Sequence, residues 1–188
     1  FEDAVAYPPN QVFIGNLAPA SLWDVARPRW SHPIEGATAS GASGDLMDQA
    51  SFYDLLAEVD QFDLVRLKQE PGPGAVPLFS GDEIVGSVAS AHDLDETLQA
   101  PILLENLSIK ASAVHALRDL LARTGVDPSA ITLAIGCGEE AIGDRYQRGG
   151  GNLGKAVAEA VGMTEASGSD VKAFCAAPVH ALIMAAGL

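Results

Sequence analysis

Cationic side chains, cysteines and long apolar runs are all scarce in this chain, and each shortage excludes a class of protein. The 188 residues include 11 lysines and arginines against 25 aspartates and glutamates, a formal net charge of −14. Nucleic acids and anionic membrane surfaces attract a cationic face, so neither is an expected partner. The two cysteines, Cys137 and Cys175, have neither the spacing of a structural zinc site nor the number needed for a secreted disulfide framework. We therefore expect reduced thiols in a cytoplasmic protein.

Segments that would direct the chain to a membrane are also missing. The first residues, Phe-Glu-Asp-Ala-Val, lack a basic region followed by an apolar one, so no signal peptide is expected. The most apolar tract, 173–188, is interrupted by Pro178 and His180 and is shorter than the roughly 18 apolar residues of a spanning helix. The lack of an initiating methionine and the apolar last residues predict a fragment, whose core is completed by residues or a partner not present here.

What the chain does have is the composition of a globular domain, with 48% apolar and 19% charged residues. Apolar side chains recur at helical spacing over 107–124, with Asn106 or Ser108 as candidate caps and Gly125 as the stop. An apolar run at 131–135 predicts a strand covered on both faces, and 153–161 predicts another helix. Helix, turn and buried strand in succession are typical of an α/β layered domain.

The first half of the chain predicts smaller elements separated by loops. We expect a strand at 11–17, a short helix at 18–26, a helix or two at 45–59, a strand at 63–67 and a hairpin around 78–88. His32 lies in a long loop, and His92 stands close to Asp93 and Asp95. These histidines are candidate acids or cation ligands, but a solvated loop histidine and a capped turn are the simpler interpretations.

The strongest candidate for chemistry is Cys175. Residues 168–174 alternate like a half-buried strand, and the apolar positions after Pro178 recur at helical spacing. Proline is tolerated in the first turn of a helix but costs about 3 kcal/mol deeper inside, so the helix should begin within a few residues of Cys175. A thiol on a sharp strand-to-helix turn is presented at the rim of the sheet, where the helix start favours the thiolate. The alternative is an inert core thiol packed among alanines.

A second group of candidates follows the strand at 131–135. Cys137 lies between two glycines, and Glu139 and Glu140 are either general bases or merely solvated carboxylates. Further on, a glycine-rich stretch before a helix can cradle an anion with its backbone N–H groups. That stretch consists of Arg148, Gly149, Gly150, Gly151 and Asn152. A turn too tight for a Cβ atom is the alternative explanation of these glycines.

Two resemblances connect these residues with known families. The order of segments in the second half resembles the N-terminal half of thiolase-like enzymes of the ketoacyl synthase III kind. These segments are a helix, the "GVDP" turn at 125–128, the apolar strand, the helix ending at Gly162 and "DVKAFCA" at 170–176. More specifically, "ENLSIKAS", "GEEAIGDRYQRGGGN" and "GSDVKAFCAAPVHAL" resemble the β-subunit family of component C of the glycine, sarcosine or betaine reductase complex. That second resemblance extends over most of the chain.

The resemblance implies both a fold and an activity. The fold is a thiolase-like half-core at 104–188, with αβα layers around a mixed sheet, on which a family-specific region at 1–103 packs. The activity is that of a cytoplasmic amino-acid reductase of fermentative metabolism, in which Cys175 carries an acetyl thioester until phosphate releases acetyl phosphate. The implied partners are the α subunit of component C, which offers a cysteine of its own, a selenoprotein that carries the carboxymethyl group on selenium, and further copies in a thiolase-type oligomer. Neither a bound cofactor nor a metal is implied for this chain, and phosphate is a co-substrate.

The same resemblance implies that these residues alone are catalytically incomplete. In the thiolase-like fold, the histidine or asparagine partners of the cysteine come from the second half. His180 follows Cys175 by less than two helical turns but lies on a different face, so it is not a candidate base. Two other functions stay open: a scaffold subunit that docks the selenoprotein or the α subunit, with Cys175 merely packed, and a ketoacyl synthase III-like condensing enzyme that uses coenzyme A thioesters.

Overall fold

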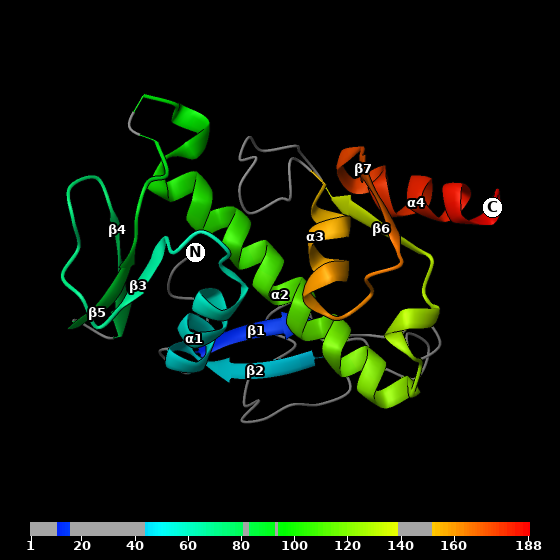
Figure 1. Cartoon of the computed structure of the whole chain (residues 1–188), viewed down its shortest axis with the longest axis horizontal. Coiled ribbons are helices and arrows are strands. Elements are labelled where there is room, and N and C mark those ends of the chain that lie inside the picture. The colour runs from blue at the N-terminus through cyan, green and yellow to red at the C-terminus, as the bar shows by residue number, and fades with distance from the viewer. Residues whose placement is uncertain (1–10, 16–43, 81–82, 93, 139–151) are drawn as a thin grey trace, which may run out of the picture.

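The long helix α2 (Ala100–Thr124) runs through the middle of the molecule (Figure 1). The structure is a computed structural model, and it describes residues 11–15, 44–80, 83–92, 94–138 and 152–188. Two small antiparallel sheets and α1 (Gln49–Val59) lie on one side of α2, and a pair of parallel strands with two short helices lies on the other. The fold is therefore mixed α/β, as expected. The helix predicted at 18–26 lies outside the described residues.

The antiparallel part contains five strands in the described ranges. β1 (Gln11–Gly15) pairs with β2 (Gly44–Asp48). In the other sheet, β5 (Glu83–Val88) lies between β3 (Val65–Leu67) and β4 (Val76–Ser80). The strands predicted at 11–17 and 63–67 and the hairpin around 78–88 are thus confirmed, with slightly different ends.

The prediction of a helix or two over 45–59 is wrong in its first part, because residues up to Asp48 belong to β2. Asp48 is the N-cap of α1, and its carboxylate accepts hydrogen bonds from the N–H and the hydroxyl of Ser51, at 2.9 and 2.6 Å. An N-cap residue has an extended backbone, so the same residue can end a strand and start a helix. The apolar spacing alone did not reveal this change.

Helix α2 is longer than predicted, because it begins at Ala100 with Pro101 in its first turn. The candidate cap Asn106 is instead a buried helical residue whose Nδ2 donates to the Ile102 carbonyl at 3.0 Å. The stop at Gly125 is confirmed: its φ is +66°, and its N–H donates to the Leu121 carbonyl at 2.9 Å.

The main core lies where α2 meets α1 and β5. Its fully buried side chains are Leu56, Val88, Leu98, Leu103, Leu107, Ala111 and Val114. Val157 from the second half belongs to the same cluster, and α2 runs across the boundary drawn at 103–104. That boundary therefore does not coincide with the end of an element. Lys110, also buried, ties α2 to α1 by donating from Nζ to the Val59 carbonyl at 2.7 Å.

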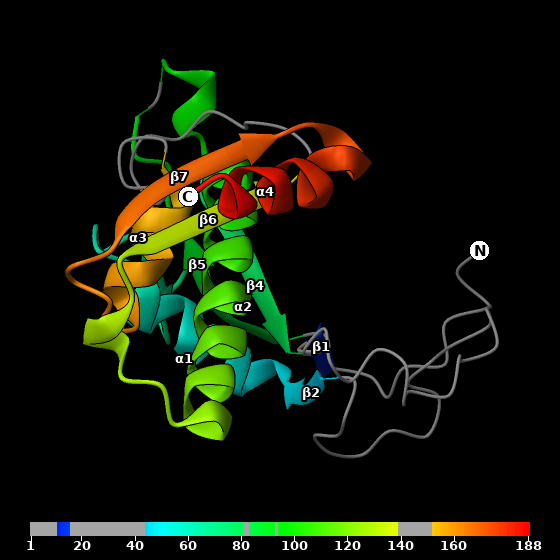
Figure 2. The same ribbon diagram turned by 90° about the vertical axis from the view of Figure 1, so that its right-hand side faces the viewer.

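The parallel pair consists of β6 (Leu133–Gly138) and β7 (Ser167–Lys172). Helices α3 (Leu153–Ala160) and α4 (Ala177–Ala186) contact both strands, and Figures 1 and 2 show the two helices on opposite sides of the pair. The helix predicted at 153–161 is confirmed, and the strand predicted at 131–135 begins two residues later, after a short 3₁₀ turn at Pro128–Ala130. Because the strands described here form separate sheets, this αβα arrangement is local, and the larger mixed sheet of a thiolase-like fold stays a prediction.

Candidate functional site at the carboxyl edge of the parallel strands

Cys175 lies on the turn that connects β7 to α4. The strand ends at Lys172, a 3₁₀ turn covers Phe174–Ala176, and α4 starts at Ala177 with Pro178 in its first turn. The predicted strand-to-helix turn is therefore confirmed. Cys175 is exposed, so the alternative of a thiol buried among alanines does not describe these residues.

The turn is strained at the residue before the cysteine. Phe174 has a φ of +48°, a conformation that costs a non-glycine residue about 1–3 kcal/mol. Its side chain is 63% exposed, so packing of the phenyl ring does not explain the conformation. Strain of this kind persists only when the flanking structure imposes it. Here the flanking elements are β7 on one side and the completely buried Ala177 of α4 on the other.

The positive end of α4 carries no side-chain cap, because its N-cap residue is Ala176. A helix start favours negative charge nearby, and Cys175 directly precedes this one. His180 is exposed on α4.

The start of α3, in contrast, is already occupied by groups of the chain itself. The carboxylate of Asp170 on β7 accepts hydrogen bonds from the N–H groups of Leu153 at 2.8 Å and Gly154 at 2.9 Å. Asn152 is the N-cap: its Oδ1 accepts from the Lys155 N–H and its Nδ2 donates to the Gly168 carbonyl, both at 2.9 Å. An external anion therefore finds these first-turn donors engaged. The other members of the predicted anion cradle, Arg148, Gly149, Gly150 and Gly151, lie outside the described residues, as do Glu139 and Glu140.

Cys137 belongs to the same edge of the sheet. It is exposed near the end of β6, and the parallel register places it opposite Val171, four residues before Cys175. Together with Lys172 and apolar residues of α2 and α3, it lines a cavity of about 260 Å³. Ligands of α/β sheets usually bind outside the carboxyl ends of parallel strands, where both thiols of this chain are found.

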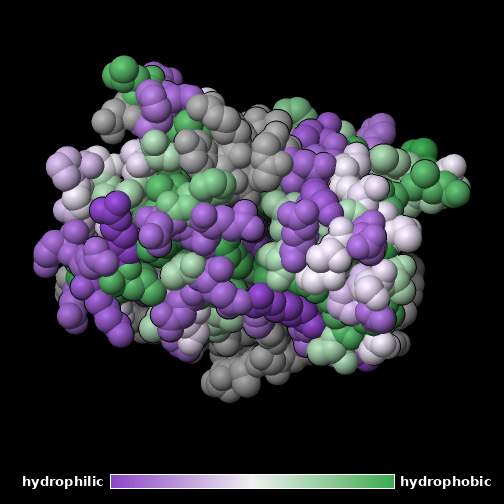
Figure 3. Space-filling view, in the orientation of Figure 1, coloured by the Kyte–Doolittle hydropathy of each residue, from purple (hydrophilic) through white to green (hydrophobic). Residues whose placement is uncertain are grey.

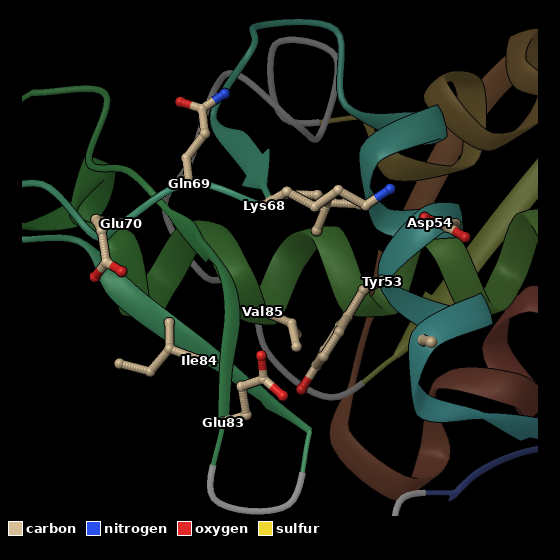
Figure 4. A pocket seen from close by; sticks show the side chains of 10 residues that line it. Tyr53, Asp54, Lys68, Gln69, Glu70, Glu83, Ile84 and Val85 are labelled. Carbon is tan, nitrogen blue, oxygen red and sulfur yellow. The ribbon is translucent and has the colours of Figure 1, made fainter.

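A second cavity, of about 520 Å³, lies between α1 and the β3–β5 sheet (Figure 4). The side chains around it include Tyr53, Asp54, Lys68, Gln69, Glu70, Glu83, Ile84 and Val85. The Tyr53 hydroxyl donates to the Phe79 carbonyl at 2.7 Å and accepts from Gln49 Nε2 at 2.6 Å, and burial raises the pKa of this phenol above its usual 10.0. Its hydroxyl thus serves the fold, and no predicted site residue lines this cavity.

His92 is part of a capped turn. The N–H of Leu94 donates to His92 Nδ1 at 3.2 Å, and Asp95 accepts from the N–H of Thr97 at 3.0 Å. His32 and Asp93 lie outside the described part of the chain. Within that part, no three His, Cys, Asp or Glu side chains are grouped as metal ligands, and no helix is both long and apolar enough to cross a membrane.

Sequence reasoning missed the role of Asp170, which it included only as one residue of the strand predicted over 168–174. No local signal identifies its role, because its partners are 16 and 17 positions away in the sequence. The strained φ of Phe174 was also unexpected, since such angles are ordinarily a signal for glycine or asparagine.

Comparison with known proteins gives one informative similarity. The chain is 39% identical, over 225 aligned residues, to the "Glycine/sarcosine/betaine reductase complex component C subunit beta" of Peptoclostridium acidaminophilum. The alignment covers 100% of this chain and 44% of that subunit, so the chain spans less than half the length of its relative. No family model and no solved structure matches. The resemblance read from the sequence segments is confirmed: over its whole length, the chain is homologous to part of a component C β subunit.

Proposed function

We propose that this chain is part of the β subunit of component C of an amino-acid reductase complex, and that Cys175 carries an acetyl group there as a thioester. The observation that carries the proposal is the position of Cys175, exposed on a strained turn between β7 and the uncapped start of α4. The similarity to the relative supports this reading over a condensing enzyme that uses coenzyme A thioesters. A thiolase-like fold and a cytoplasmic location are part of the proposal.

The proposed last step transfers the acetyl group from sulfur to phosphate. A phosphate oxygen attacks the carbonyl carbon of the thioester, and the bond between that carbon and Sγ breaks. Acetyl phosphate is released, and Cys175 remains on the protein as the thiolate. The positive end of α4 favours the negative charge that returns to the sulfur. Lys172, a partly buried cation at the same sheet edge, suits an anionic co-substrate. A selenoprotein that carries the carboxymethyl group and the α subunit of component C are the proposed partners.

The test uses the assembled complex with its substrates but without phosphate. Peptide mass spectrometry should then find an added acetyl group on the peptide that contains Cys175 and none on the peptide that contains Cys137. Addition of phosphate should remove the label. Acetylation that is confined to the α subunit would refute the carrier role of Cys175.

A scaffold role is the second candidate, and the apolar face of α4 favours it. Val179, Leu182 and Ile183 of α4, and Phe174 of the turn before it, are each more than half exposed, and Figure 3 shows apolar residues at the end of the molecule that α4 forms. Such a surface is typical of a docking site. Cys175→Ser separates the two candidates, because unchanged turnover in an intact complex supports the scaffold, whereas lost turnover in an intact complex supports the carrier.

A further inference from the structure

We infer that Asp170 is a positioning residue for the Cys175 turn, and that it acts by clamping β7 to the start of α3. The carrier role of Cys175 belongs to the proposed function, on which the catalytic meaning of this inference rests. The clamp itself is a statement about geometry, and it can be tested without acyl transfer.

The clamp consists of several short hydrogen bonds between one strand and one helix end. The two carboxylate oxygens of Asp170 accept from two successive N–H groups, those of Leu153 and Gly154, at 2.8 and 2.9 Å. Asn152 adds a bond from its Nδ2 to the Gly168 carbonyl, and Lys155 Nζ donates to the Ala166 carbonyl at 2.8 Å. A carboxylate at the positive end of a helix is favoured by the helix dipole as well. The strand that leads to Cys175 is therefore fixed to α3 at Gly168 and Asp170, and the residue just before the strand is fixed to α3 as well.

Strand β6 makes room for this clamp with a glycine. A Cβ atom on Gly136 would collide with the Asp170 carboxylate and would lie only 3.2 Å from the Gly154 nitrogen. Because Gly136 has no side chain, β6, β7 and the first turn of α3 meet around the one carboxylate. A shift of this carboxylate would consequently displace both β6, which contains Cys137, and β7, which leads to Cys175.

The clamp and Ala177 fix the two ends of the strained turn. Lys172, the last residue of β7, and Ala177, the first of α4, are separated by only four residues, one of which is Phe174 with its positive φ. The Phe174 side chain is mostly exposed, so its packing does not account for the positive φ, and we infer that the fixed ends impose the strain. Loss of the clamp leaves that end of β7 held by its pairing with β6 alone, and we expect the turn to relax and to move the sulfur away from the start of α4.

The experiment compares Asp170→Asn and Asp170→Ala with Asp127→Asn in the full-length protein. Asp127 is a matched control, because its carboxylate also caps a turn, accepting from the Ser129 N–H at 2.9 Å, but in a turn that precedes β6. The measurements are the rates of iodoacetamide alkylation at Cys175 and at Cys137 in the native protein, together with the thermal midpoint. We expect the Asp170 variants to slow alkylation of Cys175 about two- to fivefold, a typical consequence of losing a helix-end interaction, and Asp127→Asn to leave it unchanged.

Phe174→Gly provides a second test, which distinguishes a residue that positions the turn from one that merely stabilises the fold. Glycine adopts a positive φ without strain, so the turn should keep its shape when the clamp is weakened. The double variant Asp170→Asn with Phe174→Gly should then regain much of the alkylation rate, which makes the two changes non-additive. If Asp170→Asn lowers the thermal midpoint but leaves the rate at Cys175 unchanged, or if the two changes simply add, the inference is wrong. Failure of acetylation at Cys175 would overturn the proposed function and leave this result standing.

Discussion

Gly154→Ala should destabilise the protein, although alanine normally favours a helix over glycine. Gly154 lies in the first turn of α3, against the two parallel strands. A Cβ atom added there would lie 2.8 Å from the Gly136 nitrogen, 3.1 Å from the Ser169 carbonyl oxygen and 3.3 Å from the Ala134 carbonyl oxygen. All three are backbone atoms within the sheet, so no side chain can rotate away to make room.

The magnitude follows from the distance by which α3 would have to retreat. Ordinary contact begins at 3.4 Å, so the helix start has to move by at least 0.6 Å from the Gly136 nitrogen. The same movement stretches the bonds from Leu153 and Gly154 to Asp170, which are now 2.8 and 2.9 Å long. Overpacking of this kind costs about 1–3 kcal/mol, and the better helix propensity of alanine returns at most about 1 kcal/mol. We expect a net loss of roughly 1–2 kcal/mol, or about 2–8 °C in the thermal midpoint.

The assay is thermal unfolding followed by circular dichroism, with Gly187→Ala as the matched control. Gly187 follows α4 with a φ of −90°, and the nearest atoms to an added Cβ are at 3.6 and 3.7 Å. Alanine is accommodated there, so the control should be neutral or slightly stabilising. A Gly154→Ala variant that is as stable as the wild type would refute the argument that this glycine is required for close packing of helix and sheet.

Two further predictions concern other parts of the molecule. Tyr53→Phe should cost about 1–2 kcal/mol near neutral pH, since the Phe79 carbonyl loses its donor. Burial raises the pKa of Tyr53 above 10.0, so the folded state favours the neutral phenol. The resulting stability is complete below about pH 10 and is lost as the pH rises further. Urea unfolding at increasing alkaline pH should therefore show a smaller decline in the free energy of unfolding for the variant than for the wild type. Leu182→Asp should reduce binding of a hydrophobic dye to the isolated chain, because Leu182 is 70% exposed within the apolar face of α4, whereas Leu94→Asp, at an exposed position outside that face, should have little effect.

Elements with a complete local signal were predictable from the sequence. The hairpin of β4 and β5, the helix stop at Gly125 and the turn from β7 to α4 each combine apolar periodicity with a glycine or a proline that fixes a boundary. The start of α2 was missed because Asn106 and Ser108 are residue types that often cap helices, whereas Pro101 marks the actual first turn. The change from strand to helix at Asp48 was missed because the apolar spacing continues across it.

The site was predictable only in part, for a different reason. Cys175 stands out because its neighbours in the sequence define its environment. The role of Asp170 depends on two N–H groups of a helix that precedes it in the chain, and Gly154 and Gly168 owe their importance to contacts across that interface. No propensity or spacing rule registers such a contact, because it exists only after the helix has packed on the strands. A run of glycines such as 149–151 is a recognisable sequence signal, whereas single glycines such as Gly154 and Gly168 are not.

The two helices that flank the parallel strands differ in how their positive ends are used, and this difference bears on which group reacts. The chain supplies its own carboxylate and amide to α3, so the charge of that helix end is matched internally. The start of α4 has an alanine at the N-cap, and the residue just before it is an exposed thiol. Cys137 shares the edge of the sheet, one residue before the end of β6. Since a helix end favours an anion only within about its first turn, the uncapped start of α4 is the reason that we propose Cys175, which directly precedes it, as the acyl carrier.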